Sequence, residues 1–367
     1  MKYKETPLKD ITAYISKGIV PKYASQNDTN IIRVLNQRCN RNNLISLSNS
    51  RFNNLDKRNV PNEKVLKEND VLINSTGVGT AGRVAQVNDL KEKMTVDGHM
   101  IIIRPTKTVN PVFYGYAVIA NQYKIEQLAE GSTGQTEINR DRLLKDIYIK
   151  LPSLDIQNKI ANNLRILDNK ISLNNQINAN LQKLASTYFQ FFLKKIETTN
   201  VLLEEVANIK SGGDKPKDIT SKKDSDHLIP IFSNGMTNEG LYGYTKIAKI
   251  KEKAITVSAR GTIGYTCLRT EPYFPIVRLI SVIPYPKISV YYLYLWLLNT
   301  DIQGFGTTQQ QLTVPVFKKY SVSIPKDLKD MSFFDNHVSV FFEQIQKNKE
   351  ETKLLKEIKE SLLKKLF

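Results

Sequence analysis

Cysteine and histidine are scarce in this chain of 367 residues, and their scarcity excludes several classes of protein. Only two cysteines are present, Cys39 and Cys267, so a disulfide framework is excluded and a reducing, cytoplasmic location is expected. The three histidines, His99, His227 and His337, lack the spacing of metal ligands. The sequence therefore predicts no zinc site.

Long apolar runs and phosphate-binding loops are missing as well. The N-terminal segment MKYKETPLKDI lacks the apolar stretch of a signal peptide, and no run of about 18 apolar residues is present to span a membrane. The chain has no G-x-x-x-x-G-K-S/T motif, and no acidic pair recurs in both halves as a nuclease centre would need. We therefore expect a chain that is not an enzyme and that binds no metal, no cofactor and no membrane.

Positive charge, by contrast, is abundant. Lys and Arg number 53 against 36 Asp and Glu, which gives a formal net charge of +17 at pH 7. The hydrophobic content of 41% is that of a folded protein. Because the basic residues are spread along the chain and form no block, they indicate a polyanionic partner such as nucleic acid.

Four short motifs occur twice in the same order, which indicates an internal duplication. LKDITAYISKGIVPK at 8–22 matches LEEVANIKSGGDKPK at 203–217, with Gly18 opposite Gly213. The other pairs are STGVGTAG at 75–82 with SARGTIG at 258–264, GSTGQTEI at 131–138 with GTTQQQL at 306–312, and Leu151–Pro152 with Ile324–Pro325. The first copy carries about thirteen extra residues between its first two motifs, which we expect in the polar region RCNRNNLISLSNSRFNN.

Gly77, Gly79 and Gly82 form a G-x-G-x-x-G pattern that follows the apolar run DVLIN, and Asp97 lies at the spacing of a ribose-binding acid. The second copy, SARG at 258–261, does not keep the first glycine, and the following segment RVAQV alternates like a strand. We therefore predict a strand–turn–strand element in which glycine permits a tight turn. A dinucleotide site is not expected.

The pattern changes to a helical period after Pro152. Apolar residues recur at steps of four and three, which is typical of a coiled-coil seam, and the second copy shares the same heptad frame. These residues are Ile160, Leu164, Leu167, Ile171, Leu181, Ala185, Tyr188 and Phe192, and then Val338, Phe341, Ile345, Leu355, Leu362 and Leu366. We expect the two helices to pack antiparallel and to relate the two copies by an approximate two-fold axis.

Polar residues interrupt both seams at matching places, Asn174 and Asn178 in the first and Asn348 and Thr352 in the second. Two interpretations stay open. The residues are either buried, where they would fix register and partner choice, or exposed at a gap in the seam.

The fold class that follows is α+β, with two β-rich domains separated by two long antiparallel coiled-coil helices. The expected divisions are a first β-rich domain at 1–150, a central helix at 151–197, a second β-rich domain at 198–325 and a C-terminal helix at 326–367.

The twin openings ISKGIVPK and IKSGGDKPK and the twin turns STGVGTAG and SARGTIG resemble the specificity subunits of type I restriction–modification systems. The segment GSTGQTEINRDRLLKDIYIKLPSLDIQNKIANNLRILDNKISLNNQIN is similar to the central conserved region of that family. The resemblance covers nearly the whole chain. The second copy departs from it, because it lacks the glycine of STGQ and has MSFFDNHVSVFF where IQNKIANNL would be expected.

The resemblance implies two target recognition domains, each of which reads one half of a split sequence in double-stranded DNA. It implies two modification subunits, adenine-N6 methyltransferases that use S-adenosylmethionine, docked on the helices. It also implies ATP-dependent translocase–nuclease restriction subunits. The chain itself would be non-catalytic. A two-fold scaffold that does not read sequence, and an enzyme of an unrecognised class, are the alternatives.

The repeated polar loops supply most of the candidate DNA-binding residues, because hydroxyl, amide and guanidinium groups near glycine suit phosphates and base edges. Lys22 and Lys217, which follow a proline in both copies, would suit phosphate contacts. Ordinary turn chemistry is the alternative for each of them. The candidates are Lys22, Ser75, Thr76, Thr80, Arg83, Ser132, Thr133 and Gln135 in the first copy, and Lys217, Ser258, Arg260, Thr262, Thr307, Thr308 and Gln310 in the second.

Overall fold

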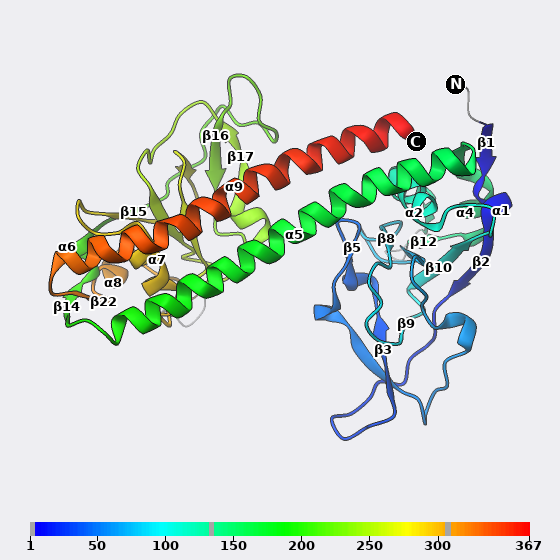
Figure 1. Cartoon of the computed structure of the whole chain (residues 1–367), viewed down its shortest axis with the longest axis horizontal. Helices are drawn as coiled ribbons and strands as arrows, with labels where there is room; N and C mark the ends of the chain where they lie inside the picture. Colours follow the sequence, from blue (N-terminus) through cyan, green and yellow to red (C-terminus); the bar gives the residue numbers. More distant parts are fainter. Residues whose placement is uncertain (1–3, 132–135, 305–309) are drawn as a thin grey trace. The chain divides into compact units, whose positions relative to one another are not determined.

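The computed structural model describes residues 4–131, 136–304 and 310–367, and its secondary structure is drawn in Figure 1. The chain forms two compact units. Unit 1 comprises Met1–Leu173 together with Glu351–Phe367, and unit 2 comprises Asn174–Glu350. Each unit therefore contains one β-rich region and one segment from each of the two long helices.

The main sheet of unit 1 has four antiparallel strands in the order β2-β10-β7-β8. Its strands are β2 (Thr12–Lys17), β10 (Met100–Pro105), β7 (Val71–Asn74) and β8 (Val84–Gln86). Both faces are covered, because alternate residues of β10 enter different cores. Ile101 and Ile103 pack with the helices, whereas Ile102 packs with residues of the second sheet.

The second sheet of unit 1 has the order β6-β3-β9, in which β3 and β9 run parallel. Its strands are β6 (Arg51–Asn54), β3 (Ile31–Leu35) and β9 (Met94–Val96). Three two-stranded pairs complete the strands: β1 (Lys4–Pro7) with β13 (Tyr148–Leu151), β4 (Asn40–Arg41) with β5 (Leu44–Ile45), and β11 (Ala129–Glu130) with β12 (Glu137–Ile138). The short helices are α1 (Leu8–Ile11), α2 (Pro111–Ala120), α3 (Gln122–Glu126), α4 (Arg140–Asp146), η1 (Gln37–Cys39), η2 (Leu47–Asn49) and η3 (Asn62–Lys64).

Unit 2 repeats this plan. Its four-stranded sheet is β15 (Ala207–Ser211), β21 (Ile280–Pro284), β18 (Ala254–Val257) and β19 (Thr266–Arg269). Its three-stranded sheet is β17 (Leu241–Thr245), β16 (Ile229–Phe232) and β20 (Phe274–Pro275), and β14 (Thr198–Leu202) pairs with β22 (Ser321–Pro325). The short helices are α6 (Leu203–Val206), α7 (Val290–Leu298), α8 (Val314–Lys318) and η4 (Thr237–Gly240). The four-stranded sheet, the three-stranded sheet and the pair β14-β22 match β2-β10-β7-β8, β6-β3-β9 and β1-β13 in strand order, so the predicted duplication is confirmed.

The strand register corrects one residue of the predicted repeat. Thr12 pairs with Pro105, but Tyr14 pairs with Arg104, so β2 contains a one-residue bulge that β15 lacks. Beyond the bulge the N–H of Gly18 donates to Met100 O (3.1 Å), and that of Gly212 donates to Leu279 O (2.8 Å). Gly212 therefore holds the position of Gly18, and the match with Gly213 was wrong by one residue.

The extra residues of the first copy lie in several loops, and the prediction of a single polar region was wrong. Residues 36–50 join β3 to β6, whereas the equivalent connection between β16 and β17 is shorter and consists of residues 233–240. Residues 55–70 join β6 to β7, where 246–253 suffice between β17 and β18. Surface loops tolerate such insertions because closing a longer loop costs little extra entropy.

The two long helices, α5 (Leu154–Leu193) and α9 (Leu328–Leu366), each contribute to both units. In unit 1, Lys170 pairs with Glu351 (3.2 Å) and Asp168 with Lys359 (2.6 Å). In unit 2, Asn178 bonds to Asn348 (2.8 Å), and Tyr188, further along α5, stacks on Phe334. As residue numbers increase along α5, the residue numbers of its partners on α9 decrease. The helix segments therefore pack antiparallel within each unit.

Of the polar residues of the seam, Asn174, Asn348 and Thr352 are each less than 10% exposed. Within unit 2, Asn348 Nδ2 donates to Asn178 Oδ1, and Asn348 Oδ1 accepts from Gln344 Nε2 at the same distance of 2.8 Å. The interpretation in which the seam residues are exposed at a gap is therefore wrong for these three, while Asn178 is half-buried. A role of this polar contact in fixing register stays a prediction.

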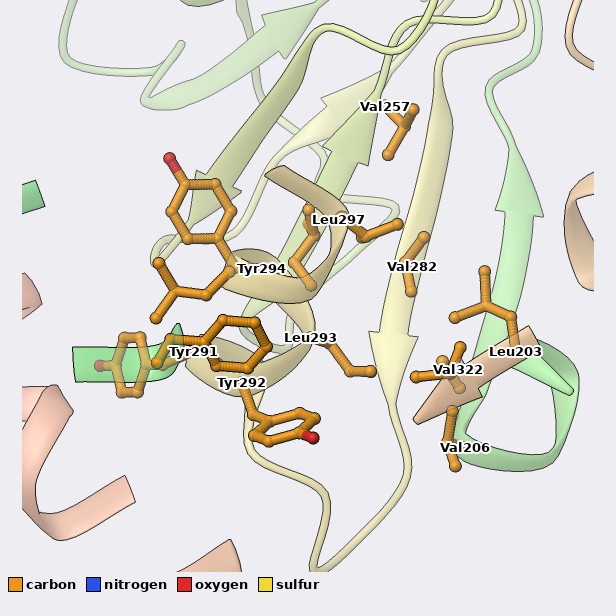
Figure 2. Close-up of a cluster of buried hydrophobic side chains, with 14 of the residues drawn as sticks. Leu203, Val206, Val257, Val282, Tyr291, Tyr292, Leu293, Tyr294, Leu297 and Val322 are labelled. Carbon is orange, nitrogen blue, oxygen red and sulfur yellow. The ribbon is translucent and has the colours of Figure 1, made fainter. Parts of the chain in front are cut away.

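The core of unit 2 combines aromatic and aliphatic side chains (Figure 2). Leu293 and Leu297 of α7 lie toward Val257 and Val282 of the main sheet, whereas Tyr291 and Tyr294 lie on the other side of the helix. Phe189 of α5 and Phe334 of α9 meet the same helix, because each lies edge-on to Tyr292 at centroid distances of 5.1 and 5.4 Å. The long helices are therefore part of the core that stabilises this β-rich region. Among the described residues, no helix is long and apolar enough to span a membrane.

Candidate nucleic-acid interface

The glycine-rich stretch of unit 1 forms the loop between β7 and β8, as the sequence predicted. The two strands pair antiparallel, and Asn74 N donates to Arg83 O (2.9 Å) to close the loop. Gly79 and Gly82 have φ values of 66° and 85°, in the left-handed region that glycine adopts without strain. A Cβ on Gly82 would also lie 2.6 Å from Glu126 Cα. These glycines are therefore explained by the turn and its packing.

Asp97 is buried, and its Oδ1 accepts from the backbone N–H of His99 (2.9 Å). Burial raises the pKa of its carboxyl above the ordinary value, while the hydrogen bond from His99 N opposes that shift. The buried Asp97 carboxyl therefore holds a local turn.

The predicted residues of the first turn differ in accessibility. Thr76 Oγ1 lies 2.7 Å from His99 Nδ1, and Arg83 Nη2 donates to Gly79 O (3.0 Å). Thr80 Oγ1 lies 3.5 Å from Thr76 O, and all three residues are partly exposed. Ser75 is fully buried, so a direct contact between its hydroxyl and DNA would require the turn to open.

The second turn is two residues shorter than the first. Ser258 N donates to Tyr265 O (2.9 Å), so Ser258 occupies the place of Asn74, and only residues 259–264 form the loop. Ser258 is buried, and its Oγ donates to Asn234 O (3.2 Å). Arg260 is partly exposed and Thr262 is exposed. The hydroxyl of Ser258 therefore holds the fold, whereas Arg260 and Thr262 reach the surface.

The remaining candidates lie at the surface or outside the described residues. Lys22 and Lys217 are exposed near the start of each copy, and Gln310 is exposed beside the second turn. Ser132, Thr133, Gln135, Thr307 and Thr308 lie outside the residues that the structure describes.

In each unit the structure brings the two repeated loops together. Ile138 N donates to Ser75 O (2.8 Å) in unit 1, and Leu312 N donates to Ala259 O (3.0 Å) in unit 2. We call each such combination a loop pair: residues 75–83 with 136–138, and residues 258–264 with 310–312. The segments lie far apart in sequence, so only the tertiary fold makes them neighbours.

Sequence reasoning missed several residues at the loop pairs. His99 and Arg278 follow the same turn in the two copies, just before β10 and β21, and contact Thr76 and Gln311 respectively. Glu137 and Gln311 also hold equivalent positions, each one residue before the backbone donor that joins the loops. The repeated motifs GSTGQTEI and GTTQQQL already placed Glu137 opposite Gln311, whereas the equivalence of His99 and Arg278 follows only from the strand pairing.

Among the described residues, no three His, Cys, Asp or Glu side chains come together as a metal site would require. Both cysteines are buried, and burial raises the pKa of each thiol above its ordinary value. The cysteines therefore lack the environment that activates a thiolate nucleophile.

Nearly the whole chain is similar to proteins of one known family. The sequence model of the type I restriction modification DNA specificity domain matches residues 1–183 and 195–360. The chain belongs to this family. The resemblance to type I specificity subunits that the repeated motifs indicated is therefore confirmed.

The relatives of this specificity protein bear names of the same kind. A Mycoplasma pneumoniae protein named as a type I specificity subunit is 33% identical over 60% of this chain, and the match spans 61% of that relative's length. The HindI type I restriction enzyme specificity subunit of Haemophilus influenzae is 21% identical over 83% of this chain and 87% of its own.

A solved structure of a type I restriction–modification S subunit from M. genitalium is similar across 100% of this chain and 96% of its own, with a TM-score of 0.62 and 17% sequence identity. That likeness shows that the two proteins share a fold.

Proposed function

We propose that this chain is the DNA-recognition subunit of a type I restriction–modification complex, and that each β-rich domain reads one half of a bipartite duplex target. The observation that carries the proposal is the loop pair, which occurs once in each unit and gathers hydroxyl, amide and guanidinium groups. The net charge of +17 supports a polyanionic ligand. The domains would be residues 1–150 and 198–325.

The helical segments 151–197 and 326–367 would form an antiparallel coiled coil that sets the spacing between the half-sites. Helices of 40 and 39 residues that each contribute to both units support this role. Exposed apolar residues on them, among them Ile166, Leu173 and Val340, offer contact area for the two modification subunits.

Catalysis would take place on partner subunits. Adenine-N6 methylation with S-adenosylmethionine belongs in this proposal to the modification subunits, and ATP-dependent translocation and cleavage belong to the restriction subunits. This chain would bind no cofactor and would position the target.

Selection from a pool of duplexes with a randomised central segment tests the proposal. The full-length chain should enrich a split sequence, and Arg260→Ala should weaken duplex binding more than Arg165→Ala. Arg165 is a suitable control because it lies on α5 and already faces Glu68 at 3.6 Å. Salt-dependent binding without any enriched sequence would favour the scaffold alternative. Methylation of the selected duplex by the pure chain with S-adenosylmethionine would favour an enzyme.

A further inference from the structure

Two arginines of unit 2 converge on one neutral oxygen. Gln311 Oε1 accepts from Arg260 Nε (3.1 Å) and Nη2 (2.8 Å), and it lies 3.4 Å from Arg278 Nη1. Within the described part of the chain, neither guanidinium group forms an ion pair with a carboxylate. An amide oxygen orients these groups but cannot neutralise them, so the second loop pair keeps two uncompensated positive charges.

At the equivalent position of unit 1 the charges are compensated. There Glu137 replaces Gln311, and its carboxylate pairs with Lys17. The cation and the anion compensate each other, so the first loop pair carries no comparable excess at this position. The two copies therefore share a backbone arrangement, while the exchange of Glu for Gln changes the local charge.

The side chain of Asn234 links the two backbone segments that carry the arginine pair of unit 2. Asn234 Nδ2 donates to Val277 O (2.6 Å), and Asn234 Oδ1 accepts from Ala259 N (2.8 Å), which ties the Arg278 segment to the Arg260 turn. Val277 and Arg278 have φ values of 53° and 60°, a left-handed conformation that is strained for a β-branched residue. Strain of this kind persists where the surroundings enforce it and is concentrated at functional sites.

We propose that Arg260, Arg278 and Gln311 form a clamp for one phosphate of the DNA backbone at the second half-site. This inference rests on the proposed function. The polar atoms that remain unengaged in the clamp are donors, so the ligand must offer acceptors, and the two uncompensated charges favour an anion. Because Gln311 occupies the Nε–Nη2 edge of Arg260, that edge is not free to read a guanine.

Binding of the full-length chain to its selected duplex, measured over a range of salt concentrations, tests the clamp. Arg278→Ala and Gln311→Glu should each lower the salt slope by about one, which corresponds to roughly tenfold weaker binding near 0.1 M salt. The selected sequence should not change, because a phosphate contact positions the protein without reading a base. Retention of that sequence also shows that the variants fold.

Two further variants serve as controls. Gln190→Glu makes the same charge change as Gln311→Glu at an exposed position of α5 and should leave the slope unchanged. Arg278→Lys keeps the charge and should restore most of the affinity lost in Arg278→Ala.

The outcomes separate this inference from the proposed function. Failure of the unaltered chain to bind duplex DNA would overturn both. Unselective but salt-dependent binding would overturn the proposed function, and the variants would still decide the clamp. If the chain selects a sequence but the variants keep its affinity and salt slope, the clamp is wrong. A base preference that changes at one position with an unchanged slope would identify a base contact and also overturn it.

Discussion

At the residue scale, Gly18 and Gly212 lie at positions that exclude any side chain. A Cβ on Gly18 would lie 2.1 Å from Val96 O and 2.3 Å from Asp97 O, and one on Gly212 would lie 2.8 Å from Pro275 C. The backbone of Gly18 thus packs directly against the end of strand β9, and that of Gly212 packs against the end of strand β20. This close approach, rather than an unusual φ, accounts for glycine in the opening motif of both copies.

Gly18→Ala should lower the free energy of unfolding by about 1–3 kcal/mol, because backbone atoms of β9 must move to admit the methyl group. Gly98→Ala is the matched control, since its Cβ would meet only Ile19 O at 3.6 Å, an ordinary contact. Urea unfolding of both variants measures the difference. Equal stability of the two would contradict the argument from close packing.

Asp97→Asn should raise the free energy of unfolding at neutral pH by about 1.4 kcal/mol for each pH unit by which the pKa is raised. The folded protein holds its Asp97 proton more tightly than the unfolded chain, so the parent loses stability as pH rises from about 4 through the raised pKa. Asparagine keeps an oxygen to accept from His99 N and removes the buried charge.

Urea unfolding at a series of pH values tests this prediction. The difference between parent and variant should grow from acid to neutral pH, whereas Asp10→Asn, at an exposed position, should leave the profile unchanged. A stabilisation that does not depend on pH would exclude titration of Asp97 as its cause.

At the scale of the element, the long helices carry a buried polar contact where a heptad pattern predicts apolar residues. Asn348→Leu alone should cost about 1–3 kcal/mol, because it leaves the amide of Asn178 without its partner. Replacing both residues by leucine should be nearly neutral or stabilising.

A double-mutant cycle of unfolding free energies measures this coupling. Additive effects of the two single substitutions would mean that the hydrogen bond contributes nothing. If the doubly substituted protein is stable but forms mixed oligomers, the pair maintains the choice of partner.

At the scale of the whole molecule, the proposed role of the helices as a ruler can be tested by lengthening both of them. Inserting seven residues near Asn178 and near Thr352 keeps the heptad frame and adds about 10 Å of helix. The preferred spacer between half-sites should then grow by roughly three base pairs, at about 3.4 Å each. Binding should also weaken, because the half-sites rotate by about a third of a turn.

Selection from duplexes of variable spacer length gives the readout. A protein with only one helix lengthened is the control, since its seam is out of register and it should lose stability. A doubly lengthened protein that folds, binds and keeps its original spacer would exclude the ruler.

The sequence by itself determined the duplication, the order of the elements and the two long helices. These features depend on local chemistry that repeats along the chain: glycine at turns, alternation in strands and apolar heptads in helices. Helices expected within 151–197 and 326–367 occur at Leu154–Leu193 and Leu328–Leu366 for that reason. The hairpin at Gly77 to Gly82 was predictable too, because the second copy lost a glycine and strand-like alternation followed.

Only the tertiary structure decided the register and the composition of the loop pairs. A bulge in β2 shifts the match of Gly18 by one residue, and it depends on pairing with β10, which is distant in sequence. Ser75 and Ser258 are buried although they belong to polar sequence motifs, so their hydroxyls are not accessible at the surface. Gln311 meets Arg260 and Arg278 only because three separate segments converge, and no local pattern records such a contact.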